Sequence, residues 1–365
     1  MSAAPESGSE VERARALVLA HGWNATAYQI VNPGIAHWFS DGGDAVVGYT
    51  DACGVRVVAG APVCRAARLA AVAAEFETAT RRSALRVCYF GAEGRLESLY
   101  RHDGRYSQVV LGAQPVWDPR RWPEIPARHA SLRAQLHRAR NKGVRVIEWE
   151  AARAERSGAL RRCLREWLAT RGLPPLHFLV EPETLSRLAD RRVFVAEIAG
   201  EPMAFLIASP VPRRNGWLVE QFVRGNRAPN GTSQLMVDAC MRALGAGGAE
   251  YVTLGLAPLS RLGARPPDHN PLWLRGVLAW VHAHGRRFYN FDGLAAFKAR
   301  LQPDSWDPIF AIVDQAAFSP RHLYAIAAAF SGGSPAAIVL RGLKRAAQTE
   351  LAWAAEPGRI ARPGV

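Results

Sequence analysis

The sequence predicts a mixed α/β protein of two domains, each with a largely antiparallel sheet flanked by helices. Three observations support this fold class. At 365 residues the chain is long enough to bury two separate cores. Short apolar runs bounded by Gly and Asp alternate with longer amphipathic runs in both halves, which is typical of strands and helices. Residues 114–126, QPVWDPRRWPEIP, are rich in Pro and Trp, which is typical of a stiff connector between domains.

The elements of the N-terminal domain, residues 1–113, follow from this alternation. Gly22 ends the first amphipathic run, and the Gly and Asp turns after it favour a series of short antiparallel strands. In the next long run Leu69, Val72 and Phe76 lie on one side of a helix. We expect helices over 10–21 and 65–82, and strands over 35–39, 44–49, 55–59 and 85–90.

Residues 114–143 combine the connector with a basic helix over 129–142, which Gly143 ends. Arg133, His137 and Arg140 recur at the spacing of one helix face, and no acid occurs within this helix. Two interpretations stay open. The stripe is either a solvated surface or a surface that contacts phosphates.

Residues 144–315 are expected to form the second, catalytic domain, and residues 316–365 an amphipathic extension with a tail. A strand, a glycine-containing loop, a buried helix and a further strand follow one another within the second domain. The extension docks either on the protein itself or on an anionic bilayer. The expected strands are 144–148, 193–198, 203–209, 217–223, 251–254 and 309–313, the expected helices 155–171, 182–189, 233–244 and 270–283, and the amphipathic stretches 318–330 and 335–347.

The net charge of +14 favours a polyanionic partner, either nucleic acid or an anionic membrane surface. A basic enzyme with neither partner stays open. The five cysteines form no CxxC or Cys/His cluster, so we expect reduced, buried thiols, a cytoplasmic location and no metal site. The first residues are polar, and no apolar run approaches the ~18 residues of a membrane span. We therefore expect neither a secretion signal nor a transmembrane segment.

The strongest candidate for a functional segment is residues 289–306, YNFDGLAAFKARLQPDSW. A helix here places Leu294, Phe297 and Leu301 on one apolar face, and Lys298 falls within the same arc. A buried ammonium needs a cavity or an anionic partner, because leaving it unpaired is costly. The alternative is that Lys298 extends to the rim of the core.

A second candidate is the loop over 224–232, RGNRAPNGT, which leads into the buried helix. Backbone N–H groups at the start of a helix form an anion site. Arg224 and Arg227 would add positive charge to that site.

Three sequence blocks occur in a defined order: APNGT at 228–232, LGLAPLS at 254–260, and NF-x-GL-x-x-FK-x-x-x-x-P-x-x-W at 290–306. They resemble the catalytic domain of phosphatidylglycerol lysyltransferases and alanyl-phosphatidylglycerol synthases, and cover about the last two-thirds of the chain. The resemblance implies two tandem GNAT-like acyltransferase domains. It also implies an aminoacyl-tRNA donor, phosphatidylglycerol as acceptor at the inner face of the cell membrane, and no cofactor. Those enzymes usually carry a multi-span membrane domain, so we expect a separate membrane protein as a possible partner for lipid translocation.

The resemblance also implies roles for individual residues. Glu220 is expected to act as general base or to bind the α-amino nitrogen of the donor, and an ion pair with Arg224 is the alternative. Lys298 and Arg300 are expected to hold the donor phosphate or the developing oxyanion. Gln234 stands where the family often has a carboxylate. The expected substrate-binding residues are Arg224, Arg227, Asn230, Gly231, Thr232, Gln234, Asn290, Arg133 and Arg140.

Two other functions stay open. A coenzyme A-dependent N-acyltransferase acting on a small amine would share the fold, although the loop over 224–229 lacks the clean Q/R-x-x-G-x-G/A pattern of coenzyme A loops. A non-catalytic module that binds RNA or a membrane would share the positive charge.

Overall fold

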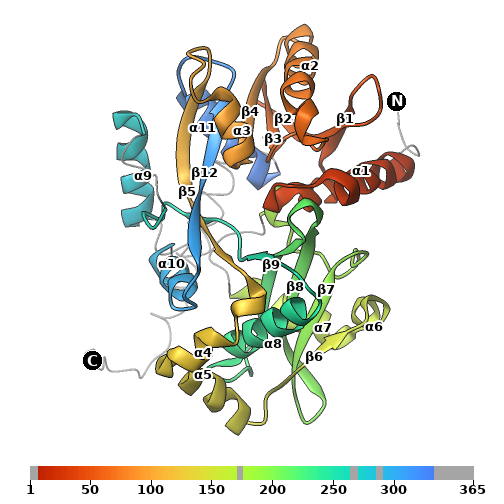
Figure 1. Ribbon diagram of the computed structural model, residues 1–365, viewed down its shortest axis with the longest axis vertical. Coiled ribbons are helices and arrows are strands. Elements are labelled where there is room, and N and C mark those ends of the chain that lie inside the picture. The colour runs from red at the N-terminus through yellow and green to blue at the C-terminus, as the bar shows by residue number, and fades with distance from the viewer. Residues whose placement is uncertain (1–6, 171–175, 264–269, 285–290, 333–365) are drawn as a thin grey trace, which may run out of the picture.

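One continuous sheet links the two halves of the chain (Figure 1). The computed structural model describes residues 7–170, 176–263, 270–284 and 291–332. Within these, the strand order is β1-β2-β3-β4-β12-β5-β10-β9-β8-β7-β6, and β11 pairs with β5 beside this path. The strands are β1 (Ala36–Phe39), β2 (Val46–Ala52), β3 (Val55–Ala59), β4 (Arg86–Ala92), β5 (Ser107–Trp117), β6 (Arg145–Trp149), β7 (Arg192–Ile198), β8 (Glu201–Val211), β9 (Gly216–Arg224), β10 (Tyr251–Thr253), β11 (Ala257–Pro258) and β12 (Ser305–Val313).

Helices cover both faces of this sheet, which confirms the expected α/β class. The α-helices are α1 (Ser7–His21), α2 (Leu69–Arg82), α3 (Gly94–Tyr100), α4 (Glu124–Arg128), α5 (Ala130–Asn141), α6 (Ala151–Arg156), α7 (Gly158–Ala169), α8 (Thr232–Ala246), α9 (Leu272–His284), α10 (Phe291–Ala299) and α11 (Pro320–Ser331). The short 3₁₀ helices are η1 (Ala25–Val31), η2 (Ala66–Arg68), η3 (Pro119–Arg121), η4 (Phe178–Val180) and η5 (Pro212–Arg214).

In the N-terminal part, the sheet has a hydrophobic core on each face. Successive side chains of a strand point to opposite faces, so each strand contributes to both cores. Val58 and Tyr89 pack with Phe76 of α2 on one face. Val57 packs on the other face with residues of α1, η1 and α11. The strands and helices expected here are therefore confirmed to within a few residues.

β5 joins the two halves because it is long enough to pair with strands of both. β12 lies between β4 and β5 and pairs with β5 from Ser305 to Val313. β10 pairs with the C-terminal end of the same strand. The run at 309–313 is expected in the C-terminal domain, yet both neighbours of β12 lie before residue 118. The domain boundaries at 113 and 143 stay a prediction.

The Pro- and Trp-rich stretch at 114–126 packs into the hydrophobic core and does not serve only as a connector. Its first residues, through Trp117, complete β5. Trp117 and Trp122 are fully buried, and their indole N–H groups donate to the Leu301 carbonyl at 3.0 Å and to Asp238 at 2.9 Å. This stretch therefore anchors α8 and the end of α10 to the sheet.

In the C-terminal part β6 to β9 are antiparallel, and β10 runs parallel to β9. α8 covers one face, where Val219 and Leu206 join its core. α7 covers the other face, where Phe205 and Val223 lie. The strands expected at 193–198, 203–209, 217–223 and 251–254 and the helix at 233–244 are confirmed as β7, β8, β9, β10 and α8.

The helix expected over 182–189 is wrong, because the structure has only turns and bends there. Leu185 and Leu188 are buried in the core under α7, and Thr184 donates its hydroxyl to Gln221 at 2.5 Å. These contacts hold the segment against the sheet in an irregular conformation. The stretch at 318–330 forms α11, and the stretch at 335–347 lies outside the described residues.

Among the described residues, no helix combines the length and apolar character that crossing a bilayer requires. All five cysteines are free thiols, and four are buried. Cys53 is the exposed exception to the expected burial.

Candidate functional site

A bulge in β9 places Glu220. Across the β8–β9 pair Ala208 faces Val219 and Ile207 faces Gln221, so Glu220 is the extra residue without a partner. A bulge redirects the side chain at that point of a strand. On the other side β10 pairs with β9 only as far as Thr253 opposite Leu218. The two strands therefore stop pairing just before the level of Glu220.

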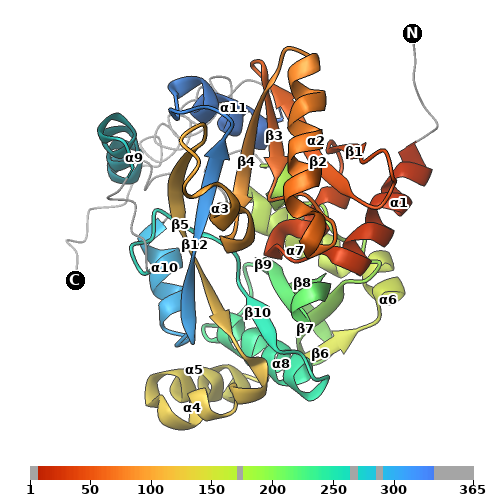
Figure 2. The ribbon, with the colours of Figure 1, turned by 45° about the horizontal axis from the view of Figure 1, so that its top comes forward.

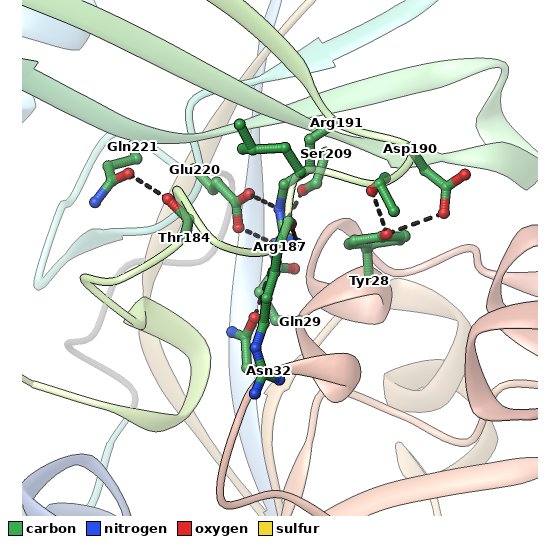
Figure 3. Close-up of polar contacts among 12 residues, drawn as sticks. Tyr28, Gln29, Asn32, Thr184, Arg187, Asp190, Arg191, Ser209, Glu220 and Gln221 are labelled. Atoms are coloured by element: carbon green, nitrogen blue, oxygen red, sulfur yellow. Dashed lines mark hydrogen bonds and ion pairs between the residues drawn. The ribbon is translucent and has the colours of Figure 1, made fainter. Parts of the chain in front are cut away.

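Two buried side chains hold the Glu220 carboxylate (Figure 3). Arg191 donates its Nε–H to Oε1 at 2.5 Å, and Gln29 donates its Nε2–H to Oε2 at 2.7 Å. The side chains of Arg191 and Glu220 are only 2% and 8% exposed. A carboxylate this buried needs such partners, because an unpaired charge inside a protein is costly.

The alternative interpretation of Glu220, an ion pair with Arg224, is wrong. Arg224 lies at the exposed end of β9, and its guanidinium turns into the following loop. It donates to the Ala228 carbonyl at 2.6 Å and to Asn230 Oδ1 at 3.2 Å. Its observed role is to brace this loop.

Four backbone N–H groups of the loop before α8 donate hydrogen bonds within the protein. The N–H groups of Gly225, Asn226, Ala228 and Thr232 donate to the Met203 carbonyl, Glu166 Oε2 and the carbonyls of Gly225 and Pro229. Gly231 has a φ of 93°, and a Cβ there would lie 2.4 Å from the Gln135 carbonyl of α5. The glycine therefore permits close packing of α5 on the start of α8. Arg227 and Asn230 are exposed, and Gln234 is half-buried. An anion site at this loop stays a prediction.

Lys298 is buried, as the helical arc predicted, with 4% of its surface exposed. Its Nζ donates to the carbonyl of Gly255 at 2.8 Å and to that of Leu256 at 3.0 Å. Burial lowers the pKa of this amine to about 7. The alternative placement at the rim is wrong. The Lys298 side chain thus connects the sequence block at 290–306 with the block at 254–260.

α10 also touches the strand that carries Glu220. Phe297 packs edge-on against Phe222, with ring centroids 6.2 Å apart. The last pair between β9 and β10 joins Leu218 to Thr253, so Glu220 and Gly255 each lie two residues beyond it. The Gly255 carbonyl that holds Lys298 therefore belongs to the chain that leaves β10.

The other predicted site residues are dispersed. Arg300 is exposed and donates to the Ala296 carbonyl of its own helix. Arg133 donates to the carbonyls of Pro126 and Ala127, which ties α5 to α4. Arg140 is half-exposed and pairs with the buried carboxylate of Asp238 at 2.9 Å. Asn290 lies outside the described residues.

Sequence reasoning missed Gln29 and Arg191. Gln29 is fully buried in η1, and its Nε2 also donates to Ser209 Oγ on β8 at 2.9 Å. Arg191 additionally donates to the Arg187 carbonyl and to Asn32 Oδ1. The arginine pair at 191–192, where β7 begins, is a weak local signal, and nothing near Gln29 indicates its partner. Within the described residues, no group of three or more His, Cys, Asp or Glu side chains is arranged to hold a metal ion.

Solved structures share this architecture. The C-terminal domain of a putative lysylphosphatidylglycerol synthetase from Agrobacterium fabrum is 22% identical and covers 90% of this chain and 99% of its own, with a TM-score of 0.76. L-PGS from Bacillus licheniformis is 21% identical and covers 87% of this chain and 95% of its own, with a TM-score of 0.73. FemX is 9% identical and covers 89% of this chain and 98% of its own, with a TM-score of 0.53. At these identities the likenesses show the fold.

A search of curated proteins gave no match. The sequence model of the family "Phosphatidylglycerol lysyltransferase, C-terminal" matches residues 15–313. This match spans both halves of the sheet and contains the bulge at Glu220, the loop before α8 and Lys298. The chain therefore belongs to the phosphatidylglycerol lysyltransferase C-terminal family.

Proposed function

We propose that this protein transfers an aminoacyl group from aminoacyl-tRNA to phosphatidylglycerol. The family match supports the transferase class. The observation that carries the proposal is the buried amine of Lys298, which the carbonyls of Gly255 and Leu256 hold just after β10, the neighbour of the strand β9 that carries Glu220. Buried ionisable groups with strongly shifted pKa values are typical of functional sites.

The chemistry requires little beyond positioning, because the aminoacyl ester is already activated. A glycerol hydroxyl of the lipid attacks the ester carbonyl and gives up its proton, and a tetrahedral oxyanion forms. Its collapse breaks the ester bond to the terminal ribose, whose oxygen takes up a proton. The product is an aminoacyl ester of the lipid and a free tRNA end.

Glu220 is proposed to receive the proton of the attacking hydroxyl. Arg191 and Gln29 keep its two oxygens in place, so the carboxylate does not have to reorganise during the reaction. Lys298 is proposed to stabilise the oxyanion and return a proton to the leaving ribose oxygen. A pKa of about 7 suits this role, because both protonation states are then accessible near neutral pH.

The donor is proposed to approach over α5. His137, Arg138 and Lys142 are exposed on this helix, and α5 packs on the start of α8. A cationic surface of this kind binds phosphates without reading sequence. Arg227 and Arg300, which are both exposed, are proposed to meet the phosphate of the donor or of the lipid.

The test is transfer of radiolabel from a panel of aminoacyl-tRNAs to phosphatidylglycerol in mixed micelles, measured by lipid extraction. Labelled lipid is expected from the wild type and none from Lys298→Ala. Arg82→Ala, on the exposed end of α2, is the control and should retain full activity. Full activity of Lys298→Ala would remove this amine from the mechanism. Thiol release from acetyl-coenzyme A with a small amine, or binding of tRNA and vesicles without any turnover, would contradict the proposed reaction.

A further inference from the structure

α9 presents an apolar outer face to solvent. Leu272 and Trp280 are 79% and 63% exposed, which makes them the two most exposed large apolar side chains of the described residues. Val277 is exposed as well, and a Cβ added at Gly276 would meet no atom within 4 Å. Contiguous apolar surface of this kind marks an interaction site more often than isolated apolar residues do.

The opposite side of α9 is anchored in the N-terminal core. Leu274 is buried there, and Leu278, one turn further on, packs against the same core. Trp273, at the edge of the exposed side, stacks on Phe318 with ring centroids 6.2 Å apart. The exposed apolar side chains therefore do not come from a helix that has failed to pack. They lie on the solvent side of a helix whose other side already packs on the N-terminal core.

The charge on this outer face is positive. Leu272, Gly276 and Trp280 recur at intervals of four and share one side of the helix. Arg275 is exposed at the border of this side, and residues 272–280 contain no acid. Tryptophan with a bordering arginine is the combination found at the boundary between lipid headgroups and acyl chains.

We propose that the outer face of α9 docks the protein on an anionic lipid bilayer. This inference rests on the proposed function, since the acceptor would be an anionic lipid. Leu272 and Trp280 enter the boundary between headgroups and acyl chains, and Arg275 meets lipid phosphates. The net charge of +14 draws the protein to the same surface. α9 lies on the same side of the molecule as α10, which carries Lys298 (Figures 1 and 2).

Vesicle flotation tests this docking. Wild-type protein is expected to float with vesicles of equal parts phosphatidylglycerol and phosphatidylcholine, and much less with phosphatidylcholine alone. The double variant Leu272→Ser/Trp280→Ser should bind the anionic vesicles at least about tenfold more weakly, because it loses two large apolar contacts. The matched control is Leu19→Ser/Leu99→Ser, which removes exposed leucines from α1 and α3 and should bind as the wild type does.

Quenching of tryptophan fluorescence by brominated acyl chains gives a second readout, which a folding defect would not reproduce. They should quench wild-type fluorescence more than that of Trp280→Phe, because Trp280 reaches the bilayer. Equal flotation of the double variant and the wild type would overturn the proposal. So would a wild-type dimer that the double variant abolishes, since a second copy would then cover α9. Failure of the full-length wild type to float would overturn it too.

Turnover separates this proposal from the proposed function. The Leu272→Ser/Trp280→Ser variant is expected to keep wild-type transfer to dispersed short-chain phosphatidylglycerol and to lose transfer to vesicles. Flotation that depends on α9 without transfer to either lipid form would leave the docking surface intact and reject the proposed reaction. Equal transfer by variant and wild type on vesicles would reject the docking surface alone.

Discussion

Gln29, in the N-terminal half, donates its side-chain amide to Glu220 in the C-terminal half, with Nε2 and Oε2 2.7 Å apart. The second hydrogen of the same nitrogen goes to Ser209. The buried Oε1 of Gln29 has no partner among the described residues. Rotating the amide would turn this oxygen toward the carboxylate, which is less favourable. The orientation of Gln29 is therefore set by Glu220, and the N-terminal half helps to hold the proposed base.

Replacing Gln29 by leucine should reduce kcat/KM for transfer by about ten- to hundredfold, the range expected for loss of a hydrogen bond to a charged group. Initial rates of transfer over a range of lipid concentrations measure this loss. Gln108→Leu is the control, since Gln108 donates to the Glu97 carbonyl away from the bulge. An unchanged kcat/KM in Gln29→Leu would show that its hydrogen bond to Glu220 does not contribute to transfer.

Arg191 and Glu220 should be energetically coupled. Arg191→Met leaves a buried carboxylate without its charge partner, and we expect a loss of about 3–5 kcal/mol in unfolding free energy. In the double variant Arg191→Met/Glu220→Gln, the loss should be smaller than the sum of the two single losses. Urea unfolding of the wild type, the two single variants and the double variant measures this difference. The neighbouring pair Arg192–Glu148 is more exposed, so Arg192→Met should cost about 1 kcal/mol or less. Additive losses for Arg191 and Glu220 would contradict the coupling.

The lowered pKa of Lys298 predicts how stability changes with pH. The folded protein holds this amine with a pKa of about 7, whereas an unfolded lysine titrates near 10.5. Between these values the unfolded chain binds more protons, so the wild type gains stability as pH rises. It should gain about 2 kcal/mol over Lys298→Met between pH 7 and pH 9. The full slope of 1.36 kcal/mol per pH unit is not reached near pH 7, because the folded amine is still about half-protonated there. Unfolding by urea at both pH values measures this difference. The same pH response in both proteins would show that the amine is not desolvated.

The exposed cations of α5 should contribute to tRNA affinity. Arg138→Ala/Lys142→Ala is expected to weaken binding uniformly across tRNA species and to lower the slope of log K against log salt by about two. Titration at several salt concentrations measures both. Arg82→Ala/Arg162→Ala, on α2 and α7, is the control and should leave the slope unchanged. Arg140 is unsuitable for this test because it also satisfies the buried Asp238.

Local patterns were enough to predict several features. The strands β7, β8 and β9 and the buried helix α8 were expected close to their observed bounds, because apolar periodicity and glycine turns act within one element. The burial of Lys298 was predictable for the same reason, since it shares a helical arc with Leu294, Phe297 and Leu301. The helix expected over 182–189 failed because the leucines at 185 and 188 fit a helix but pack from an irregular segment.

The sequence by itself determined the class of the fold, most of its elements and the placement of one lysine inside the protein. Only the tertiary structure decided which residues surround Glu220 and where β12 joins the sheet. Gln29 lies 191 residues from Glu220, and Arg191 lies 29 residues from it. Contacts over such separations depend on how whole elements pack. Arg224 was the closer candidate along the chain, but the end of β9 directs it into the loop, while the bulge aims Glu220 at η1.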